Sequence, residues 1–270
     1  MNPVALVVSD IDGTLVTPDK KLTDAARRAV QKLRAANIGF TITSSRPPLG
    51  MRMLLAPLDI TLPIGPFNGS TIVDPNLDVI VQHLIPHDAA QRSFAVCAEF
   101  SVDVWLFTHD RWLIQKRDGD YVDHEARTVD IAPVIVESLD PFAADACKIV
   151  GVSADHDRLR RCETAMQAAL GNSAAVARSQ DYYLDITPPG QNKGSFVTAM
   201  AQRLAIPTHM IASIGDMSND VPMFKVSGTS IAMGNASAEV QARATHVTLT
   251  NREDGFAHAI EMILDRHHAG

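Results

Sequence analysis

The chain has 270 residues, of which 46% are hydrophobic and 20% are charged, so it can bury the core of one large domain or of two smaller ones. This composition excludes a disordered or fibrous protein. The 24 Lys and Arg residues against 31 Asp and Glu residues give a formal net charge of −7, which argues against nucleic acid as a partner, because such proteins bind phosphate through a basic surface.

The N-terminal segment and the cysteines indicate in which cellular compartment the protein is found. The apolar run within residues 1–10 lacks a basic start and ends at Asp10, before it is long enough for a signal peptide. No later stretch approaches the roughly 18 consecutive apolar residues of a membrane span. Cys97, Cys147 and Cys162 are odd in number and form no CxxC pair, which argues against a disulfide framework or a zinc site. We therefore expect a cytoplasmic protein without membrane association.

Both ends of the chain predict the same α/β pattern. Residues 4–8 form a short, continuous apolar run that is typical of a strand buried on both faces of a parallel sheet. Thr23 is a suitable cap for a helix that ends near residues 37–39, and a second strand is expected over 40–43. Near the C-terminus, strands are expected over 210–214 and 229–233, with helices from Asn219 and over 253–267. This order predicts a parallel sheet covered by helices.

The middle of the chain predicts a different arrangement. Helices are expected near 88–100 and 155–170, and strands near 102–108, 111–116, 147–152, 174–177 and 182–186. The first two strands are separated only by His109 and Asp110, which indicates an antiparallel hairpin. We therefore expect an α+β domain over residues 82–186, inserted into an α/β core formed by 1–81 and 187–270, with Pro188-Pro189-Gly190 as a hinge.

The motif Asp10-Ile11-Asp12-Gly13-Thr14-Leu15 follows the first predicted strand. Ligands of open α/β sheets bind at the carboxyl ends of the strands. One carboxylate there can attack phosphorus and form an acyl phosphate, and a second can act first as an acid and then as a base. A solvated turn is the alternative, since Asp and Gly are common in turns. An EF-hand is a poorer match, because its twelfth position requires Glu and is Lys21 here.

A second acidic motif, Gly215-Asp216-Met217-Ser218-Asn219-Asp220, follows another predicted buried strand. Carboxylate oxygens gathered beside a substrate phosphate are typical of a Mg²⁺ site, because this ion prefers hard oxygen ligands. The alternative is a helix cap formed by Ser218 or Asn219. Two acidic motifs at neighbouring strand ends favour the functional interpretation over two unrelated turns.

Two polar segments lie between the acidic motifs. Thr43-Ser44-Ser45-Arg46 follows a predicted strand, and Asn192-Lys193-Gly194 opens a predicted helix. A hydroxyl and an ammonium are suited to holding and neutralising a phosphoryl group. Taken alone, each segment is explained equally well by a loop, a cap or a surface charge.

The four motifs, in this order, resemble those of the haloacid dehalogenase (HAD) superfamily, and specifically its Cof-type subfamily IIB with an inserted C2B cap. The resemblance covers essentially the whole chain, with Phe67-Asn68-Gly69 similar to a turn common in this subfamily. It implies a Rossmann-like parallel-sheet core and a C2-type cap domain over residues 82–186. The subfamily usually has Thr-Gly-Arg where this chain has Ser44-Ser45-Arg46, which keeps the hydroxyl and changes the loop.

The resemblance implies a Mg²⁺-dependent phosphatase that acts on a small phosphomonoester, such as a sugar phosphate. In this family pattern Asp10 is the nucleophile, and Asp12 protonates the leaving oxygen and later activates water. The side chains of Asp10 and Asp216 and the backbone carbonyl of Asp12 are expected to hold Mg²⁺.

The resemblance also implies that Ser44, Lys193 and Asn219 bind phosphoryl oxygens, while Asp220 orients Lys193 or a metal-bound water. It leaves three other functions open: a dedicated phosphatase of the mannosyl-3-phosphoglycerate or sucrose-phosphate type, a phosphomutase, and a non-catalytic regulator that binds a phosphorylated metabolite. The presence of both Asp10 and Asp12 argues against the regulator, because a sensor does not need an acid/base pair. The substrate, the specificity residues and the oligomeric state do not follow from the sequence.

Overall fold

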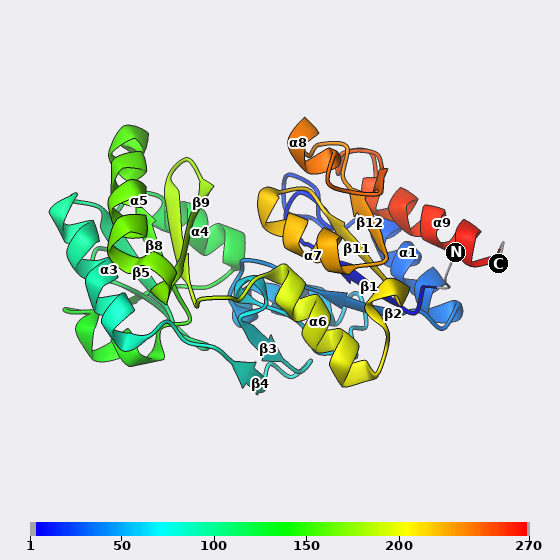
Figure 1. Cartoon of the computed structure of the whole chain (residues 1–270), viewed down its shortest axis with the longest axis horizontal. Coiled ribbons are helices and arrows are strands. Elements are labelled where there is room, and N and C mark those ends of the chain that lie inside the picture. Colours follow the sequence, from blue (N-terminus) through cyan, green and yellow to red (C-terminus); the bar gives the residue numbers. More distant parts are fainter. Residues whose placement is uncertain (1–3, 269–270) are drawn as a thin grey trace. The chain divides into compact units, whose positions relative to one another are not determined.

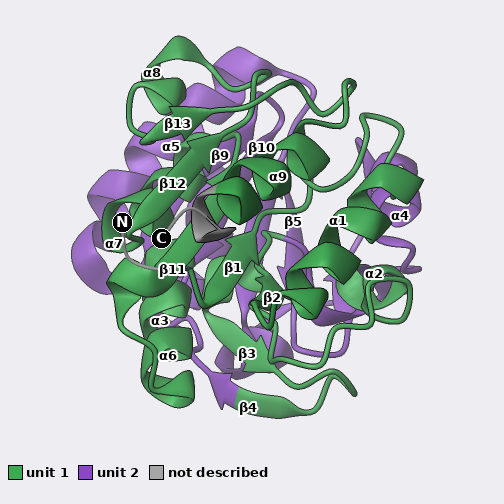
Figure 2. Cartoon of the chain, turned by 90° about the vertical axis from the view of Figure 1, so that its right-hand side faces the viewer, with its two compact units in different colours: residues 1–45, 51–80, 192–270 green, residues 46–50, 81–191 purple. Residues whose placement is uncertain are grey.

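The computed structural model describes residues 4–268, and the chain forms two compact units (Figures 1 and 2). Unit 1 consists of Met1–Ser45, Met51–Ile80 and Asn192–Gly270, and unit 2 consists of Arg46–Gly50 and Val81–Gln191. The inserted segment was predicted as 82–186. In the structure, the longer segment of unit 2 is Val81–Gln191, and its last strand is β10 (Tyr183–Thr187).

Unit 1 contains a five-stranded sheet in the order β13-β12-β11-β1-β2, with every pair parallel. Its strands lie within one or two residues of the predicted ranges, apart from the short β13, which was not predicted: β1 (Leu6–Ser9), β2 (Gly39–Ile42), β11 (Ile211–Gly215), β12 (Thr229–Ala232) and β13 (His246–Val247). Figure 1 shows β1 and β11, from opposite ends of the chain, side by side. The predicted α/β class with a parallel central sheet is confirmed.

Helices cover both faces of this sheet. α1 (Asp24–Ala35) and α9 (Gly255–His268) pack together and share one apolar core with the sheet, while α7 (Val221–Val226) packs against β11 and β12 beside α6 (Lys193–Leu204). Residues Leu6, Val7 and Val8 are therefore fully buried, which explains why β1 is apolar at consecutive positions. The predicted cap is confirmed, since Thr23 Oγ1 accepts a hydrogen bond of 3.1 Å from the Ala26 N–H.

The order of the strands creates a switch point beside β1. The chain moves from β1 to β2 on one side, whereas β11 and β12 lie on the other side. Connections from β1 and β11 therefore leave in opposite directions, and a crevice forms beyond the carboxyl ends of these two strands. Asp10 follows β1 directly and Asp216 follows β11 directly. The fold thus brings both acidic motifs to the same edge of the sheet.

Unit 2 has its own six-stranded sheet in the order β7-β6-β5-β8-β10-β9. The other strands are β5 (Asp103–Phe107), β6 (Trp112–Ile114), β7 (Val134–Ile135), β8 (Lys148–Val152) and β9 (Ala175–Gln180). The predicted antiparallel hairpin is confirmed by the β5–β6 pair. Helices α3 (His87–Glu99) and α5 (His156–Leu170) bury one face of this sheet in a second apolar core.

Several short elements were not predicted. They are α2 (Arg52–Leu55), β3 (Thr71–Val73), β4 (Val79–Gln82), α4 (Val122–Val129), α8 (Ala238–Gln241) and the strands β7 and β13. Elements of two to eight residues are too short to show a hydrophobic period. The helix expected from Asn219 begins as a 3₁₀ turn over Ser218–Asp220 before α7. No helix among residues 4–268 is long and apolar enough to cross a membrane.

Leu33 tests the contribution of the helix layer to the stability of unit 1. Its side chain is fully buried where α1 meets the sheet and α9. We expect Leu33→Ala to lower the free energy of unfolding by about 2–5 kcal/mol, through lost burial and the resulting cavity. Arg28→Ala, on the exposed face of α1, should change it by less than about 0.5 kcal/mol. Urea unfolding followed by circular dichroism measures both, and equal effects would contradict the packing described.

Candidate active site

Two buried carboxylates lie at the carboxyl edge of the sheet in unit 1. Asp10 is 4% exposed and Asp216 is 7% exposed. The backbone N–H of Asp10 donates to the carbonyl of Ile214 at 2.9 Å, which continues the β1–β11 ladder by one residue and fixes the position of Asp10. A carboxylate is costly to bury unless it is paired with a cation or coordinates one. This burial is the first indication that the two acids have a specific task.

Lys193 supplies one positive charge to these acids. Its side chain is only 1% exposed, and Nζ lies 2.6 Å from Asp10 Oδ1 and 2.5 Å from Asp220 Oδ1. The first turn of α6 places it there, because the Asn192 side chain accepts hydrogen bonds from the N–H groups of Gly194 and Ser195. Sequence reasoning placed Lys193 at a helix start, and the structure adds that its ammonium is shared by two acids.

Asp220 supports this arrangement from one side. Its Oδ2 accepts hydrogen bonds from the N–H groups of Asp216 at 2.8 Å and Met217 at 2.9 Å, while Oδ1 contacts Lys193. A Cβ on Gly215 would lie 2.4 Å from the Asp220 Cγ, so only glycine permits this close approach. Because both of its oxygens are already in use, Asp220 is better suited to orienting Lys193 and the loop than to binding a substrate.

Asp216 is held by residues to which sequence reasoning gave no role. Thr14 Oγ1 donates to Asp216 Oδ1 at 3.1 Å, and Asn235 Nδ2 lies 3.3 Å from Asp216 Oδ2 and 2.9 Å from the Gly13 carbonyl. Gly13 has φ of +84°, and a Cβ there would lie 2.2 Å from Asp216 Oδ2. In the sequence, Asn235 could have been found from its position shortly after the strand β12, because residues that follow parallel strands lie at the same edge of the sheet.

The carboxylates of Asp10, Asp216 and Asp220 form a group that suits a divalent cation. Among the described residues, one oxygen from each lies within 4.8 Å of the others.

The acids have raised pKa values. Burial raises the pKa of Asp10 to about 6, although the charge of Lys193 opposes this shift. Burial and the negative charges of Asp10 and Asp220 raise the pKa of Asp216 to about 8. Burial alone would lower the pKa of Lys193, but the charges of Asp10 and Asp220 outweigh it and raise this pKa above its usual value. Even while Asp216 keeps its proton, the carboxylates of Asp10 and Asp220 outnumber the one ammonium, and the excess of negative charge grows when Asp216 loses that proton.

Asp12 occupies a different environment from Asp10. Its carboxylate is 29% exposed, contacts the Lys20 ammonium at 2.7 Å and is not one of the three clustered acids. Ile11, between the two, is fully buried in the apolar core. The motif therefore places one carboxylate against Lys193 and the other in a more hydrated position. Different environments allow two carboxylates to take different chemical roles.

Ser44 and Asn219 are connected through Asn68. Ser44 is buried two residues after β2, and its carbonyl accepts a hydrogen bond of 2.7 Å from the Asn68 N–H. Asn219 Nδ2 lies 3.1 Å from Asn68 Oδ1, while the buried Asn219 Oδ1 has no hydrogen-bond partner in the described part of the chain. The turn containing Asn68, which has a left-handed φ of 58°, was recognised in the sequence, but its link between the two predicted residues was missed.

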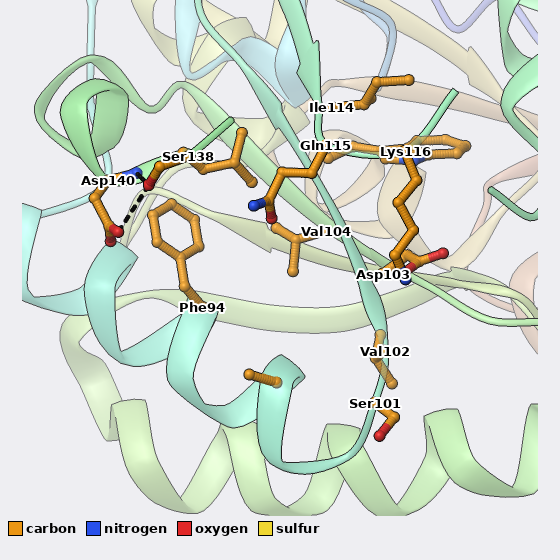
Figure 3. Close-up of a pocket in the computed structure, with 13 residues that line it drawn as sticks. Phe94, Ser101, Val102, Asp103, Val104, Ile114, Gln115, Lys116, Ser138 and Asp140 are labelled. Atoms are coloured by element: carbon orange, nitrogen blue, oxygen red, sulfur yellow. Dashed lines mark hydrogen bonds and ion pairs between the residues drawn. The ribbon is translucent and has the colours of Figure 1, made fainter. Parts of the chain in front are cut away.

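Unit 2 contains a separate cavity of about 420 Å³, shown in Figure 3. It combines apolar residues of α3 and β5, such as Phe94 and Val104, with polar groups that already pair with one another. Lys116 contacts Asp103 at 2.6 Å and Ser138 contacts Asp140 at 2.9 Å. None of the predicted site residues lines this cavity.

Comparisons with known proteins extend over both units. A family model described as haloacid dehalogenase-like hydrolase matches residues 7–260. The 5-amino-6-(5-phospho-D-ribitylamino)uracil phosphatase YwtE of Bacillus subtilis is 27% identical, covering 97% of this chain and 99% of that protein. The HMP-PP phosphatase of Cronobacter sakazakii is 26% identical, with coverages of 96% and 95%. The solved structure of the HAD subclass IIB sugar phosphatase BT4131 has the same fold, with a TM-score of 0.83 at 19% identity and coverages of 96% and 98%.

The raised pKa values predict that stability without divalent metal falls as the pH rises from about 4 to about 8. Asp10 and Asp216 keep their protons in the folded chain over pH values at which an unfolded carboxyl, with a pKa of 3.8, has lost its own. The folded state therefore binds more protons in this window, and each rise in pH favours unfolding. Urea unfolding in EDTA between pH 5 and pH 8 measures the slope.

Asp216→Asn removes the carboxyl with the larger shift and should flatten this slope while raising stability at pH 8. Asp88→Asn, at a side chain that is 90% exposed, serves as the control and should leave the slope unchanged. A slope that is the same in Asp216→Asn as in the unmodified protein would show that Asp216 is not the responsible group.

Proposed function

We propose that this chain, which belongs to the haloacid dehalogenase-like hydrolase family, is a Mg²⁺-dependent enzyme that cleaves small phosphomonoesters through an aspartyl-phosphate. The predicted resemblance to this family and to the subclass IIB fold is confirmed, and the chain is a phosphatase. The metal, the intermediate and the choice of substrate are the proposal. The main observation that supports the proposal is the buried Lys193 ammonium, which contacts both Asp10 and Asp220 beside Asp216.

The proposed metal ligands are the side chains of Asp10 and Asp216 and the backbone carbonyl of Asp12. The excess negative charge of the acids supports a divalent cation, and oxygen ligands favour Mg²⁺. When bound, the cation supplies charge that offsets the repulsion between an anionic nucleophile and a dianionic phosphate.

The first step uses Asp10 as the nucleophile. A carboxylate oxygen of Asp10 attacks phosphorus, the phosphoryl group moves to Asp10, and the bond to the leaving oxygen breaks. Lys193 lies against Asp10, so its ammonium is close to the developing charge. We assign Ser44 and Asn219 to the phosphoryl oxygens, and the unpartnered Asn219 Oδ1 is consistent with a network that a ligand completes.

Asp12 serves both steps as acid and base. It gives its proton to the leaving oxygen as the phosphorus–oxygen bond breaks, and then takes a proton from the water that attacks the aspartyl-phosphate. Inorganic phosphate and the free Asp10 carboxylate result. The partial exposure of Asp12, against the burial of Asp10, supports this division because Asp12 must exchange protons with solvent.

We propose a phosphorylated metabolite with a sugar or sugar-alcohol part as the substrate, in agreement with the substrate named for YwtE. HMP-PP is a second candidate because it is named for another full-length relative. We assign unit 2 as the inserted cap domain of the family. The cytoplasm is the proposed location, since the buried Cys97 and Cys162 form no disulfide, as is typical of a reducing compartment.

Asp10→Asn tests the reaction class. We expect phosphate release from p-nitrophenyl phosphate and from a panel of sugar phosphates to fall at least about 10³-fold, because the amide cannot act as the nucleophile. The same panel should show no release by the unmodified protein in EDTA and recovery with Mg²⁺. Asp88→Asn is the control with the same change in charge.

The variant should fold, since Asp10→Asn removes a buried charge, and its melting temperature in EDTA checks this point. Turnover retained in Asp10→Asn would exclude the proposed intermediate. Transfer of phosphate to a second metabolite without release would favour a phosphomutase, and Mg²⁺-independent binding without turnover would favour the regulator.

A further inference from the structure

We infer that Lys20 is a positioning residue for Asp12, holding the carboxyl group of Asp12 where it meets the leaving oxygen of the substrate. The inference rests on the proposed phosphatase function. Lys20 Nζ lies 2.7 Å from Asp12 Oδ1, and the two side chains are 39% and 29% exposed. A partly exposed carboxylate samples several rotamers in water, and a charge-assisted hydrogen bond at this distance restrains it.

The turn over residues 17–21 positions the Lys20 side chain next to Asp12. The Thr17 N–H donates to the Lys21 carbonyl at 3.0 Å, and the Lys20 N–H donates to the Thr17 carbonyl at 2.9 Å. A third hydrogen bond of 3.1 Å within the turn is donated by the Lys21 N–H to Thr17 Oγ1. The turn is therefore defined by its own hydrogen bonds, and the Lys20–Asp12 contact is not needed to form it.

The backbone conformation of Lys20 supports a role for its side chain. Its φ is 63°, in the left-handed region, where a side chain costs free energy and where Gly or Asn is favoured. A lysine at this position gives the turn no local advantage. An unfavourable conformation kept in a residue that contacts a catalytic group points to a functional reason.

Lys193 does not replace Lys20 in this task. Its ammonium contacts Asp10 and Asp220, and it is fully buried with them. The two acids of the first motif therefore each have a lysine, one buried and one near solvent. An ion pair as exposed as Lys20–Asp12 contributes little to folding stability, so its main effect is on the orientation of Asp12.

The neighbouring Lys21 provides a matched control. It is the same residue type in the same turn, but its side chain is 77% exposed and contacts Asp19 at 2.7 Å. Replacing either lysine with methionine removes one positive charge from the turn. Only the replacement of Lys20 removes a contact with Asp12.

The chemistry of the leaving group separates positioning of Asp12 from a general loss of structure. An alkyl leaving oxygen requires a proton as the phosphorus–oxygen bond breaks, whereas p-nitrophenolate is stable enough to leave without one. The ratio kcat/KM reports the reaction up to release of the leaving group, so it excludes the later hydrolysis step. We therefore compare kcat/KM for the best alkyl phosphate of the panel with kcat/KM for p-nitrophenyl phosphate.

We expect Lys20→Met to lower kcat/KM about tenfold for the alkyl phosphate, which is less than the roughly 10²-fold loss that a fixed misplacement of about 1 Å can cause, and less than about twofold for p-nitrophenyl phosphate. Asp12→Asn should show the same selectivity with a larger loss, about 10²–10⁴-fold for the alkyl ester. Lys20→Arg should recover most of the activity, and Lys21→Met should resemble the unmodified protein with both esters.

Equal losses with both esters in Lys20→Met, or equal activity of Lys20→Met and Lys21→Met, would overturn the inference. A lack of recovery in Lys20→Arg would do the same. These outcomes are distinct from failure of the proposed function, which appears as phosphate release that persists in Asp10→Asn whichever lysine is present.

Discussion

The buried ammonium of Lys193 is the interaction on which the site depends. It joins Asp10 to Asp220, and Lys193 and Asp10 are 183 residues apart in the chain. A charge with almost no access to water must be paired, so the start of α6 and the ends of β1 and β11 are held at fixed distances. The contacts of Lys193 therefore connect distant parts of unit 1 and also fix the positions of the acidic side chains. Because three acids share one ammonium, the site can accommodate a second cation.

Much of this arrangement could be predicted because strand ends are visible in the sequence. Asp10 and Asp216 each come just after a predicted buried strand, and the carboxyl ends of parallel strands share one edge of a sheet. The roles of Lys193, Asp12 and Ser44 were predicted from the resemblance to the haloacid dehalogenase superfamily, because a lysine at a helix start or a serine in a loop indicates no function when taken alone. Distance, burial and the sharing of Lys193 between two acids required the structure, because they depend on how segments far apart in the chain meet.

The contacts that were missed leave no local pattern in the sequence. Asn235 and Thr14 each contact Asp216, and Asn68 connects Ser44 with Asn219. A single polar residue in a loop has many explanations, and a hydrogen bond across 222 residues, such as Asn235 to Gly13, has no signature in either segment.

The two apolar cores of the chain are composed of different residues. Among residues 4–268, one core belongs wholly to unit 1 and the other wholly to unit 2, and the acids, Lys193, Thr14 and Asn235 lie in unit 1. Substitutions inside unit 2 can therefore accumulate over evolutionary time without disturbing the packing that supports the acids. Unit 2 can therefore change as a whole, through insertions and altered strands, while the acidic site in unit 1 keeps the same residues and the same chemistry.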